Sequence, residues 1–520
     1  MTHDDIESVR LVVGLEVHIE LATRSKMFSR APNPAAPAYD GAAPNTLIDP
    51  VVLALPGSLP VMNKAAVEMA MMVGLALNCS IAEQTKWDRK SYFYPDLPKG
   101  YQISQYDLPL CFDGSLEIPE VDAAGFPNFA GEPRRIGIIR AHLEEDAGKL
   151  LHEAPGGHAI DYSIVDYNRA GTPLLEVVTQ PEFRSADEVV IFGKMLRDIC
   201  RFLGVSEGVM QKGHMRFEPN INTQVTLKDG HIVTTPIVEI KNLNSFKALK
   251  GAIEYELADQ PRRWLHDHRV MGKGTKVTRG WDDARGQTVV QREKEEAHDY
   301  RYFPDPDLPP VYVDEAWQGR VRERIPELPM ARLRRYMEQF GLGVKEAAAL
   351  VEERDVCLFY ELCVEDLVKL KVERSRAGKV AANMLLQAGA RRANERGVQM
   401  NELGITPANV AAIGRLREDG RISNQAADEL FGVLAEPEQS VRGAEEVAGE
   451  RGLLIVKDDA ALEKWVDEVI AANPKAAEDV RAGKVAAAGR LVGEVMKLAG
   501  GKVDAKGVRE AVLRKLGAGK

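Results

Sequence analysis

The chain has 520 residues, of which 45% are hydrophobic and 28% charged, a composition that excludes both a disordered chain and a scaffold held by disulfides. Its five cysteines are scattered and form no CxxC pair, which argues against a thiolate zinc site and predicts a reducing, cytoplasmic environment. The net charge of −10 disfavours nucleic-acid binding over the whole surface, and the acidic N-terminus and short apolar stretches predict neither an export signal nor a membrane span.

Three regions with different secondary-structure patterns follow one another along the chain. Short strand patterns alternate with Pro and Gly turns and a few helices, which predicts an α+β domain with a mostly antiparallel sheet over residues 1–314. After the proline cluster FPDPDLPPVYV, the helical spacing of Ala, Leu, Glu and Arg predicts an all-α helical domain over 315–450. Short helices separated by Gly predict a small helical tail domain over 451–520.

The predicted tail is basic. Residues 481–520 contain ten Lys or Arg and three Asp or Glu. A basic tail on an acidic body permits contact with a polyanion at that end, and a helical end with solvated lysines explains the charge equally well.

Charged residues alternate with apolar ones along the expected strands of the first region. In VGLEVHIEL, Leu15 and Val17 alternate with Glu16 and His18, so a strand here buries one face and turns carboxylates and an imidazole to the other. A single strand of this kind is most often an ordinary amphipathic surface strand. Four later segments also set polar residues among apolar ones, and these polar residues include Arg140, His142, Glu144, Glu176, Arg216, Glu218 and Lys241.

If these strands pair in one antiparallel sheet, their carboxylates converge on one surface. Clustered carboxylates need neutralisation, and Mg²⁺ favours oxygen ligands while keeping waters for phosphate oxygens. Arg140, Arg216 and Lys241 would then be available for phosphate charge, so the pattern predicts phosphoryl transfer from a nucleotide. The sequence contains no GxxxxGK[ST] loop, so such a site is not a P-loop. The alternative is a solvated acidic face on a structural sheet.

Six motifs in a fixed order connect the chain with a known family. They resemble those of the B subunit of the aspartyl/glutamyl-tRNA(Asn/Gln) amidotransferases, and the resemblance runs from about residue 10 to the C-terminus. It implies a glutamine-synthetase-like catalytic domain followed by the helical domain and the tail. The motifs are GLEVHIEL, RKSYFYPDLPKGYQISQ, HLEEDAGK, VDYNRAGTPLLEVV, EIKNLNSFKAL and EEAHDYRYFPDPDLPP.

The resemblance also implies a reaction, that of a ligase forming carbon–nitrogen bonds with glutamine as amido donor. ATP phosphorylates the side-chain carboxylate of Glu-tRNA(Gln) or Asp-tRNA(Asn), and ammonia then displaces the phosphate. The partners implied are the misacylated tRNA, an amidase (the A subunit) that releases the ammonia, and a small third protein (the C subunit). Which of the two tRNAs is the substrate, or whether both are, stays open.

Site residues carry over from the family motif by motif. The implied metal ligands, for Mg²⁺, are Glu16, His18, Glu144, Glu145, Glu176 and Glu218. The implied catalytic residues are Glu16, His18, Glu144, Arg216 and Glu218. Candidate ATP-binding residues are Arg140, His142 and Lys241. Candidates for tRNA phosphate contacts in the tail are Lys497, Lys502, Lys506 and Arg509.

The chain departs from the family at two places. Glu218 stands where the family usually has Asp, and Gln211 and Lys212 replace two acidic residues just upstream. Some relatives carry a zinc site of paired cysteines that this chain lacks, so no zinc is expected. The changes around Glu218 motivate an alternative function, a non-catalytic tRNA-binding scaffold subunit.

Overall fold

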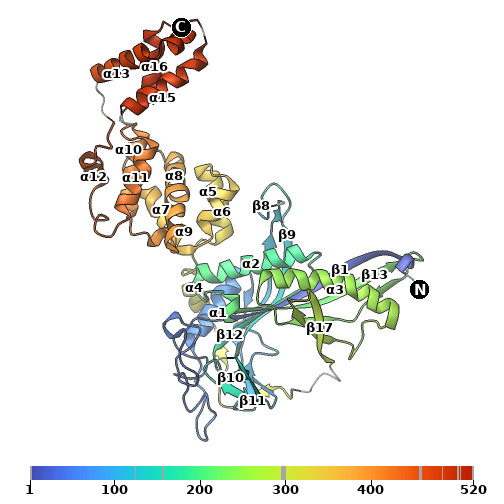
Figure 1. Cartoon of the computed structure of the whole chain (residues 1–520). Coiled ribbons are helices and arrows are strands. Elements are labelled where there is room, and N and C mark those ends of the chain that lie inside the picture. Colours follow the sequence, from blue (N-terminus) through green and yellow to red (C-terminus); the bar gives the residue numbers. More distant parts are fainter. Residues whose placement is uncertain are drawn as a thin grey trace. The chain divides into compact units, whose positions relative to one another are not determined.

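The computed structural model describes residues 3–122, 124–154, 157–293, 300–455, 459–482, 484–499, 503 and 505–517. The chain forms two compact units, Met1–Pro329 and Met330–Lys520 (Figure 1). The first unit extends beyond residue 314, where the sequence predicts the end of the α+β domain. Helix α4 (Glu315–Arg322) belongs to this unit because it packs on α1 (Lys64–Ala76).

The first unit is built on one large sheet. Its strand order is β17-β16-β15-β13-β1-β12-β9-β5-β4-β18, with β14 beside β13, β6 beside β9 and β2 beside β6. Neighbouring strands pair antiparallel, except for the parallel pair of β15 and β16. The predicted α+β class with a mostly antiparallel sheet is therefore confirmed. The strands are β1 Ile6–Glu20, β2 Ser80–Ile81, β4 Asp88–Ser91, β5 Tyr101–Ser104, β6 Cys111–Ile118, β9 Arg134–Glu145, β12 Pro173–Thr179, β13 Met215–Leu227, β14 Ile232–Thr234, β15 Val238–Lys241, β16 Val277–Asp282, β17 Gln287–Glu293 and β18 Phe303–Pro304.

Smaller elements complete the first unit. Two-stranded sheets join β3 with β19, β7 with β8 and β10 with β11. Their bounds are β3 Gln84–Thr85, β7 Glu120–Val121, β8 Pro127–Asn128, β10 Lys149–Ala154, β11 His158–Asp166 and β19 Val311–Tyr312. The remaining helices of the unit are η1 His3–Asp5, η2 Pro37–Tyr39, α2 Ala186–Leu203, η3 Met210–Lys212 and α3 Phe246–Asp267.

Helices α2 and α3 lie along one face of the large sheet (Figure 1). Ser185 and Ser245 begin them, each side chain accepting a hydrogen bond from a backbone N–H of the first turn. The alternate apolar residues of β1 from Leu11 to Ile19 are at most 4% exposed and share a core with these helices. Because successive side chains of a strand point to opposite faces, the polar residues of β1 point to the face that α2 and α3 leave open.

The second unit is helical in its described part. Its helices are α5 Pro329–Phe340, α6 Val344–Val351, α7 Arg354–Lys369, α8 Arg374–Asn383, a π-helical turn η4 Met384–Gly389, α9 Ala390–Arg396, η5 Met400–Glu402, α10 Pro407–Glu418, α11 Asn424–Leu434, α12 Ala444–Glu450, α13 Asp459–Ala472, α14 Pro474–Arg481, η6 Val485–Ala487, α15 Ala488–Leu498 and α16 Ala505–Lys515. Apolar residues between Val466 and Leu516 form a core of their own. A separate tail domain over 451–520 stays a prediction. None of the helices in the described ranges has the length and apolar character needed to cross a bilayer.

Candidate functional site

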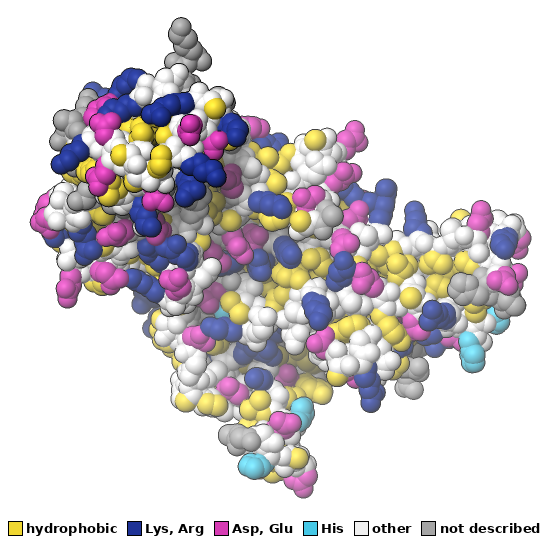
Figure 2. All heavy atoms as spheres, turned by 45° about the horizontal axis from the view of Figure 1, so that its top comes forward, with side chains coloured by type: hydrophobic (Ala, Val, Ile, Leu, Met, Phe, Trp, Pro, Cys, Tyr) yellow, Lys and Arg dark blue, Asp and Glu magenta, His cyan; other side chains and the backbone are white. Residues whose placement is uncertain are grey.

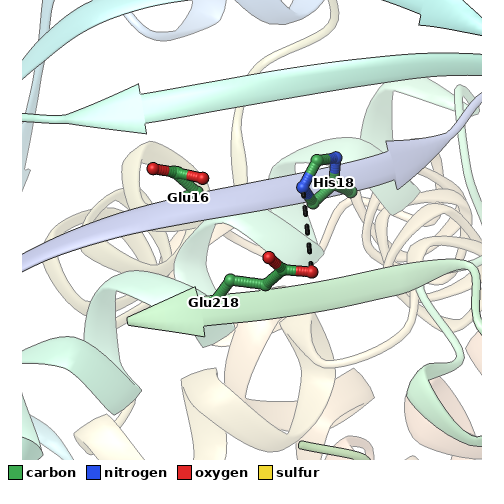
Figure 3. A group of neighbouring side chains, drawn as sticks. All are labelled: Glu16, His18 and Glu218. Atoms are coloured by element: carbon green, nitrogen blue, oxygen red, sulfur yellow. Dashed lines mark ion pairs between the residues drawn. The ribbon is translucent and has the colours of Figure 1, made fainter. Parts of the chain in front are cut away.

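Glu16 and His18 lie two residues apart on β1, which runs between β13 and β12. In the register of the antiparallel pairs, Glu16 lies opposite Glu218 of β13, and His18 lies opposite Glu176 of β12. Glu144 reaches the same place from β9, the next strand beyond β12. Figure 3 shows Glu16 and His18 extending from β1 beside Glu218 from the neighbouring strand. The predicted convergence of these side chains is thus present.

We call Glu16, His18, Glu144, Glu176 and Glu218 the acidic cluster. Nδ1 of His18 lies 3.3 Å from Oε1 of Glu144 and 3.9 Å from Oε2 of Glu176, whereas Nε2 lies 4.0 Å from Oε1 of Glu218. Potential ligand atoms of Glu16, His18 and Glu218 lie within 4.8 Å of one another, and so do those of His18, Glu144 and Glu176. His18 therefore joins two groups of possible metal ligands.

Glu145 does not join this cluster, contrary to the prediction from the HLEED motif. Glu144 and Glu145 are consecutive on β9, so their side chains point to opposite faces of the sheet. The Glu145 carboxylate accepts hydrogen bonds from Nζ of Lys99 and, at 3.0 Å, from the N–H of Ile103. Strand alternation alone could have separated the two glutamates at the level of sequence.

The crowding of carboxylates shifts the pKa values within the acidic cluster. Burial raises the pKa of Glu16, and the charge of Glu176 raises it further. Burial also raises the pKa of Glu176, with the charge of Glu144 adding to the effect. Burial alone would lower the pKa of His18, but its interactions with Glu144 and the other carboxylates raise it to about 9. The four glutamates of the cluster thus carry more negative charge than His18 can neutralise.

Two lysines lie next to the acidic cluster: Lys241 at the end of β15 and Lys276 just before β16. Nζ of Lys241 lies 2.6 Å from Oε2 of Glu218 and 3.0 Å from Oε1 of Glu239, and Nζ of Lys276 lies 2.7 Å from the other oxygen of Glu239. Burial would raise the pKa of Glu239, but the two lysines lower it to about 2. Burial would lower the pKa of Lys241, and Glu218 and Glu239 instead raise it. Glu239 and Lys241 are therefore both charged at neutral pH.

The other predicted basic residues border the acidic cluster. Nη2 of Arg140 lies 3.9 Å from Oε1 of Glu176, and Nε2 of His142 lies 3.8 Å from Oε2. Burial lowers the pKa of His142 to about 4, so its imidazole is neutral at pH 7. Arg216 donates a hydrogen bond of 2.7 Å to Asp146. The guanidinium of Arg216 is thereby held beside the cluster rather than in contact with its carboxylates.

A cavity of about 850 Å³ opens above the acidic cluster, within the size range of ligand sites. All five residues of the cluster line it, together with Arg216 and Lys241. Arg140 and His142 are not among its lining residues in the described part of the chain. Because Arg140 and His142 lie at the border of the acidic cluster and do not line the cavity, the cavity does not support the prediction that they bind ATP.

Two lysines that the strand patterns did not predict, Lys90 and Lys276, also line this cavity. Lys90 lies in β4, within the motif RKSYFYP, and Lys276 directly precedes β16. Nothing in the alternation of β1 or β13 indicates either residue. The parallel pairing of β16 with β15 brings Lys276 beside Glu239, and this pairing has no local sequence signal.

The residues of the acidic cluster fit a hard divalent cation. They offer carboxylate oxygens and one imidazole nitrogen, a donor set suited to Mg²⁺ or Mn²⁺. Nδ1 of His18 is buried, and although it lies at ion-pair distance from Glu144 it makes no well-aligned hydrogen bond with any described residue. A cation bound here would satisfy this nitrogen and neutralise the carboxylates whose pKa values are raised.

Neutralising one ligand should stabilise the metal-free protein. We expect Glu176→Gln to raise the free energy of unfolding by about 0.5–2 kcal/mol at pH 7 in EDTA, because the amide removes a buried charge at nearly constant volume. The sign follows from the raised pKa of Glu176, since folding disfavours the charged form at every pH above the pKa of the unfolded chain.

Thermal unfolding with and without Mg²⁺ measures this effect. Mg²⁺ should raise the melting temperature of the wild-type chain more than that of the variant, because ligand binding stabilises the folded state. The exposed Glu117 on β6 provides the control, and Glu117→Gln should change neither value. A Glu176→Gln chain less stable than wild type in EDTA would contradict the electrostatic description of the cluster.

The structure describes the side chains of two of the four tail residues predicted to contact tRNA. The side chains of Lys497 in α15 and Arg509 in α16 are exposed. Lys502 lies outside the described residues, and so does the side chain of Lys506. On the face shown in Figure 2, Lys and Arg side chains are interspersed with Asp and Glu rather than gathered in one patch. A role of the tail in tRNA binding stays a prediction.

Comparison with known proteins agrees with the two-part organisation. Residues 11–319 match the family described as the GatB/GatE catalytic domain, and residues 366–516 match the family described as the GatB domain. The first match contains the whole acidic cluster as well as Lys90 and Lys276.

Curated relatives cover nearly the full chain. The aspartyl/glutamyl-tRNA(Asn/Gln) amidotransferase B subunit of Thermomicrobium roseum is 45% identical over 493 residues, which are 95% of each chain. The proteins of the same name from Moorella thermoacetica and Thermobifida fusca are 44% and 43% identical, over 95% and 99% of this chain and 96% of each relative. With this coverage and the acidic cluster inside the matched catalytic domain, the chain belongs to the family of aspartyl/glutamyl-tRNA(Asn/Gln) amidotransferase B subunits.

Proposed function

We propose that this chain uses ATP to phosphorylate the side-chain carboxylate of an amino acid esterified to tRNA and then joins ammonia to it. The products are Gln-tRNA(Gln), Asn-tRNA(Asn) or both. The observation that carries the proposal is the acidic cluster, which lies beside Lys241 and Lys276 in a cavity of the matched catalytic domain.

The chemistry requires an activated carboxylate, because an oxide ion is a poor leaving group. A side-chain oxygen attacks the γ-phosphorus of ATP, the bond to the bridging oxygen breaks, and ADP leaves. The nitrogen of ammonia then attacks the acyl carbon, the carbon–oxygen bond to phosphate breaks, and the nitrogen loses a proton to give the amide. Besides the aminoacyl-tRNA, these two steps consume only ATP and ammonia, and they release ADP and phosphate.

Several charged groups of the chain suit the first step. Bound Mg²⁺, held by residues of the acidic cluster, would offset negative charge on the phosphates. Lys241, Lys276 and Lys90 provide ammonium groups around the same cavity, where they would stabilise charge that develops on transferred phosphate oxygens. Asn220 donates a hydrogen bond of 2.9 Å to Oε1 of Glu16 and so fixes the orientation of one ligand carboxylate.

The proposal includes partners and a polyanionic substrate. The name of the relatives designates one subunit of an amidotransferase and so supports an assembly with others. We propose that these are an amidase (the A subunit) that supplies ammonia and a small third protein (the C subunit). Misacylated tRNA would place its acceptor end at the acidic cluster. The exposed Lys497 and Arg509 would contact its phosphates, which positions tRNA without reading its sequence.

Charge reversal in the tail provides a test of this interaction with tRNA. We expect the double variant Lys497→Glu, Arg509→Glu to weaken tRNA binding and to lower the slope of log affinity against log salt by about one for each phosphate that is no longer bound. Filter binding at several salt concentrations measures both quantities. Lys345→Glu, a reversal of an exposed lysine in α6, serves as the control. Unchanged affinity and slope in the double variant would remove these two residues from the tRNA interface.

ADP release by the reconstituted enzyme tests the proposed function itself. The chain is assembled with the amidase and the small third protein in the presence of Mg²⁺ and ATP, and receives uncharged tRNA, Glu-tRNA(Gln) or Asp-tRNA(Asn). Release that depends on a misacylated tRNA supports the proposal and identifies the substrate. If the assembly binds tRNA but no charged tRNA stimulates ADP release, the chain is a non-catalytic tRNA-binding scaffold subunit.

A further inference from the structure

A cavity of about 490 Å³ opens among the helices of the second unit, within the size range of small-molecule sites. Its lining comes from α8, η4, α10 and α11, which pack against one another (Figure 1). Among the described residues, none lines both this cavity and the one above the acidic cluster. A ligand bound here would therefore be separate from the chemistry of the acidic cluster.

One wall of this cavity is an irregular stretch of helix. The π-helical turn η4 follows α8 directly and continues into α9. Met384, Gln387 and Ala388 of this turn line the cavity. A π-helical turn is rare, and such turns inside α-helices frequently lie at functional sites. The turn is thus a second observation, besides the cavity itself, that favours a ligand site.

Two carboxylates that line the cavity are held in place by arginines. Arg376 of α8 donates hydrogen bonds to both oxygens of Glu418 at the end of α10. Asp428 of α11 accepts hydrogen bonds of 2.8 Å from Arg391 and 3.0 Å from Arg392, both in α9. Because an ionised carboxylate has about four lone-pair sites, each can accept a further donor. The cavity therefore offers fixed acceptors for a cationic group.

Arg417, which also lines the cavity, is suited to an anionic group. Its side chain is 19% exposed, and its ion pair with the neighbouring Glu418 spans 3.8 Å, too long for a hydrogen bond. A guanidinium has five N–H donors in a planar fork that matches the geometry of a carboxylate. Three amide side chains, those of Asn383, Gln387 and Asn424, add uncharged donors and acceptors to the lining.

This lining favours a zwitterion over a nucleotide. Proteins commonly stack unpaired nucleobases on aromatic side chains, and the described lining of this cavity contains none. A phosphate would lie near the carboxylates of Glu418 and Asp428, which repel it. An α-amino acid, by contrast, carries a carboxylate for Arg417 and an ammonium group for the two carboxylates. A side chain that ends in an amide complements the amides of the lining.

We propose that this cavity binds a free α-amino acid with an amide side chain, glutamine or asparagine. Arg417 binds the α-carboxylate, and Glu418 and Asp428 accept hydrogen bonds from the ammonium group. No hydroxyl or thiol is present among the described lining side chains, so the assigned role is binding and not hydrolysis. The inference goes beyond the proposed function and does not depend on it, because no residue of the acidic cluster takes part.

Titration calorimetry of the full chain, without the proposed partners, tests the site. We expect glutamine or asparagine to bind with a dissociation constant below about 1 mM. Arg417→Met should weaken this binding by at least about tenfold, because it removes the partner of the α-carboxylate. Asn424→Ala, at the exposed first residue of α11, should weaken it by at least about threefold and provides a second variant if the loss of Arg417 perturbs folding.

The control is Lys379→Met, which removes one positive charge from an exposed position of α8 outside the cavity. It should leave the affinity within about twofold of wild type. Two analogues test the polar ends of the ligand separately. 4-Aminobutanamide is glutamine without its α-carboxylate, and N-acetylglutamine lacks the ammonium group. Both should bind at least about tenfold more weakly than glutamine.

The outcomes decide between an amino acid, a nucleotide and an empty cavity. Binding of glutamine or asparagine that is weakened in folded cavity variants and retained in Lys379→Met supports the proposal. It is overturned if neither amino acid binds the wild-type chain, or if both cavity variants bind as wild type does. Binding of adenosine monophosphate instead of the amino acids, weakened by Arg417→Met, overturns it in favour of a nucleotide. The proposed function is tested separately, by ADP release.

Discussion

Glu16→Ala is expected to reduce aminoacyl-tRNA-dependent ATP cleavage by at least on the order of 10²-fold, measured as ADP release by the reconstituted enzyme. Glu16 lies opposite Glu218 on the open face of the sheet, and Asn220 holds its carboxylate in place. Removing it takes away an oxygen ligand of the proposed Mg²⁺ site. The glutaminase activity of the proposed amidase partner, measured without tRNA, should remain, because the proposal assigns that activity to a separate protein.

The control for this variant is Glu117→Ala, which removes an exposed glutamate from β6 of the same sheet. It should leave ADP release unchanged. Folding of the Glu16→Ala chain is not expected to suffer, since burial and the neighbouring Glu176 already disfavour the charged form of Glu16. Undiminished ADP release in a folded Glu16→Ala enzyme would defeat the assignment of the metal site.

Lys241→Met is expected to lower kcat for ADP release by roughly 10²–10³-fold, since it removes a preorganised positive charge from the cavity. The ammonium lies 2.6 Å from Glu218 and 3.0 Å from Glu239, so the substitution also leaves Glu218 with more uncompensated charge. Methionine keeps most of the side-chain volume. Glu239 retains Lys276 at 2.7 Å, which should keep β15 and β16 in place.

The matching control is Lys228→Met, at an exposed position just after β13. Steady-state kinetics with ATP as the varied substrate should show normal activity for Lys228→Met. For Lys241→Met, a loss confined to KM for ATP would indicate that the lysine binds ground-state phosphate only. Normal kcat and KM would exclude Lys241 from the reaction.

Much of the site can be predicted from the alternation of residues along the strands. The sequence VGLEVHIEL defines which side chains of β1 are buried, and the structure has Glu16 and His18 on the open face. The acidic cluster follows once the strands pair, because antiparallel neighbours with one buried face have little freedom of register. The reaction is implied only by the family motifs, because the alternation of polar and apolar residues along a strand does not specify which chemistry takes place.

One departure from the predicted site has a local cause, and two others arise from contacts between segments far apart in the sequence. The HLEED motif groups Glu145 with Glu144, but adjacent residues of a strand point to opposite faces. Lys276 reaches the site through the parallel pairing of β15 with β16, which joins segments that hold no pattern in common. The end of the first unit lies beyond residue 314 because α4 packs on α1, and helical spacing alone does not reveal which neighbour a helix contacts.

The transfer of oxygen from the substrate to phosphate tests the central claim most directly. The reconstituted enzyme receives ATP, Mg²⁺, glutamine and a misacylated tRNA whose side-chain carboxylate carries oxygen-18. Activation of the carboxylate by phosphorylation predicts that one labelled oxygen per amide formed appears in inorganic phosphate, as detected by mass spectrometry. Amide formation that leaves the phosphate unlabelled would contradict the account, because the carboxylate would then have been activated without forming an acyl phosphate.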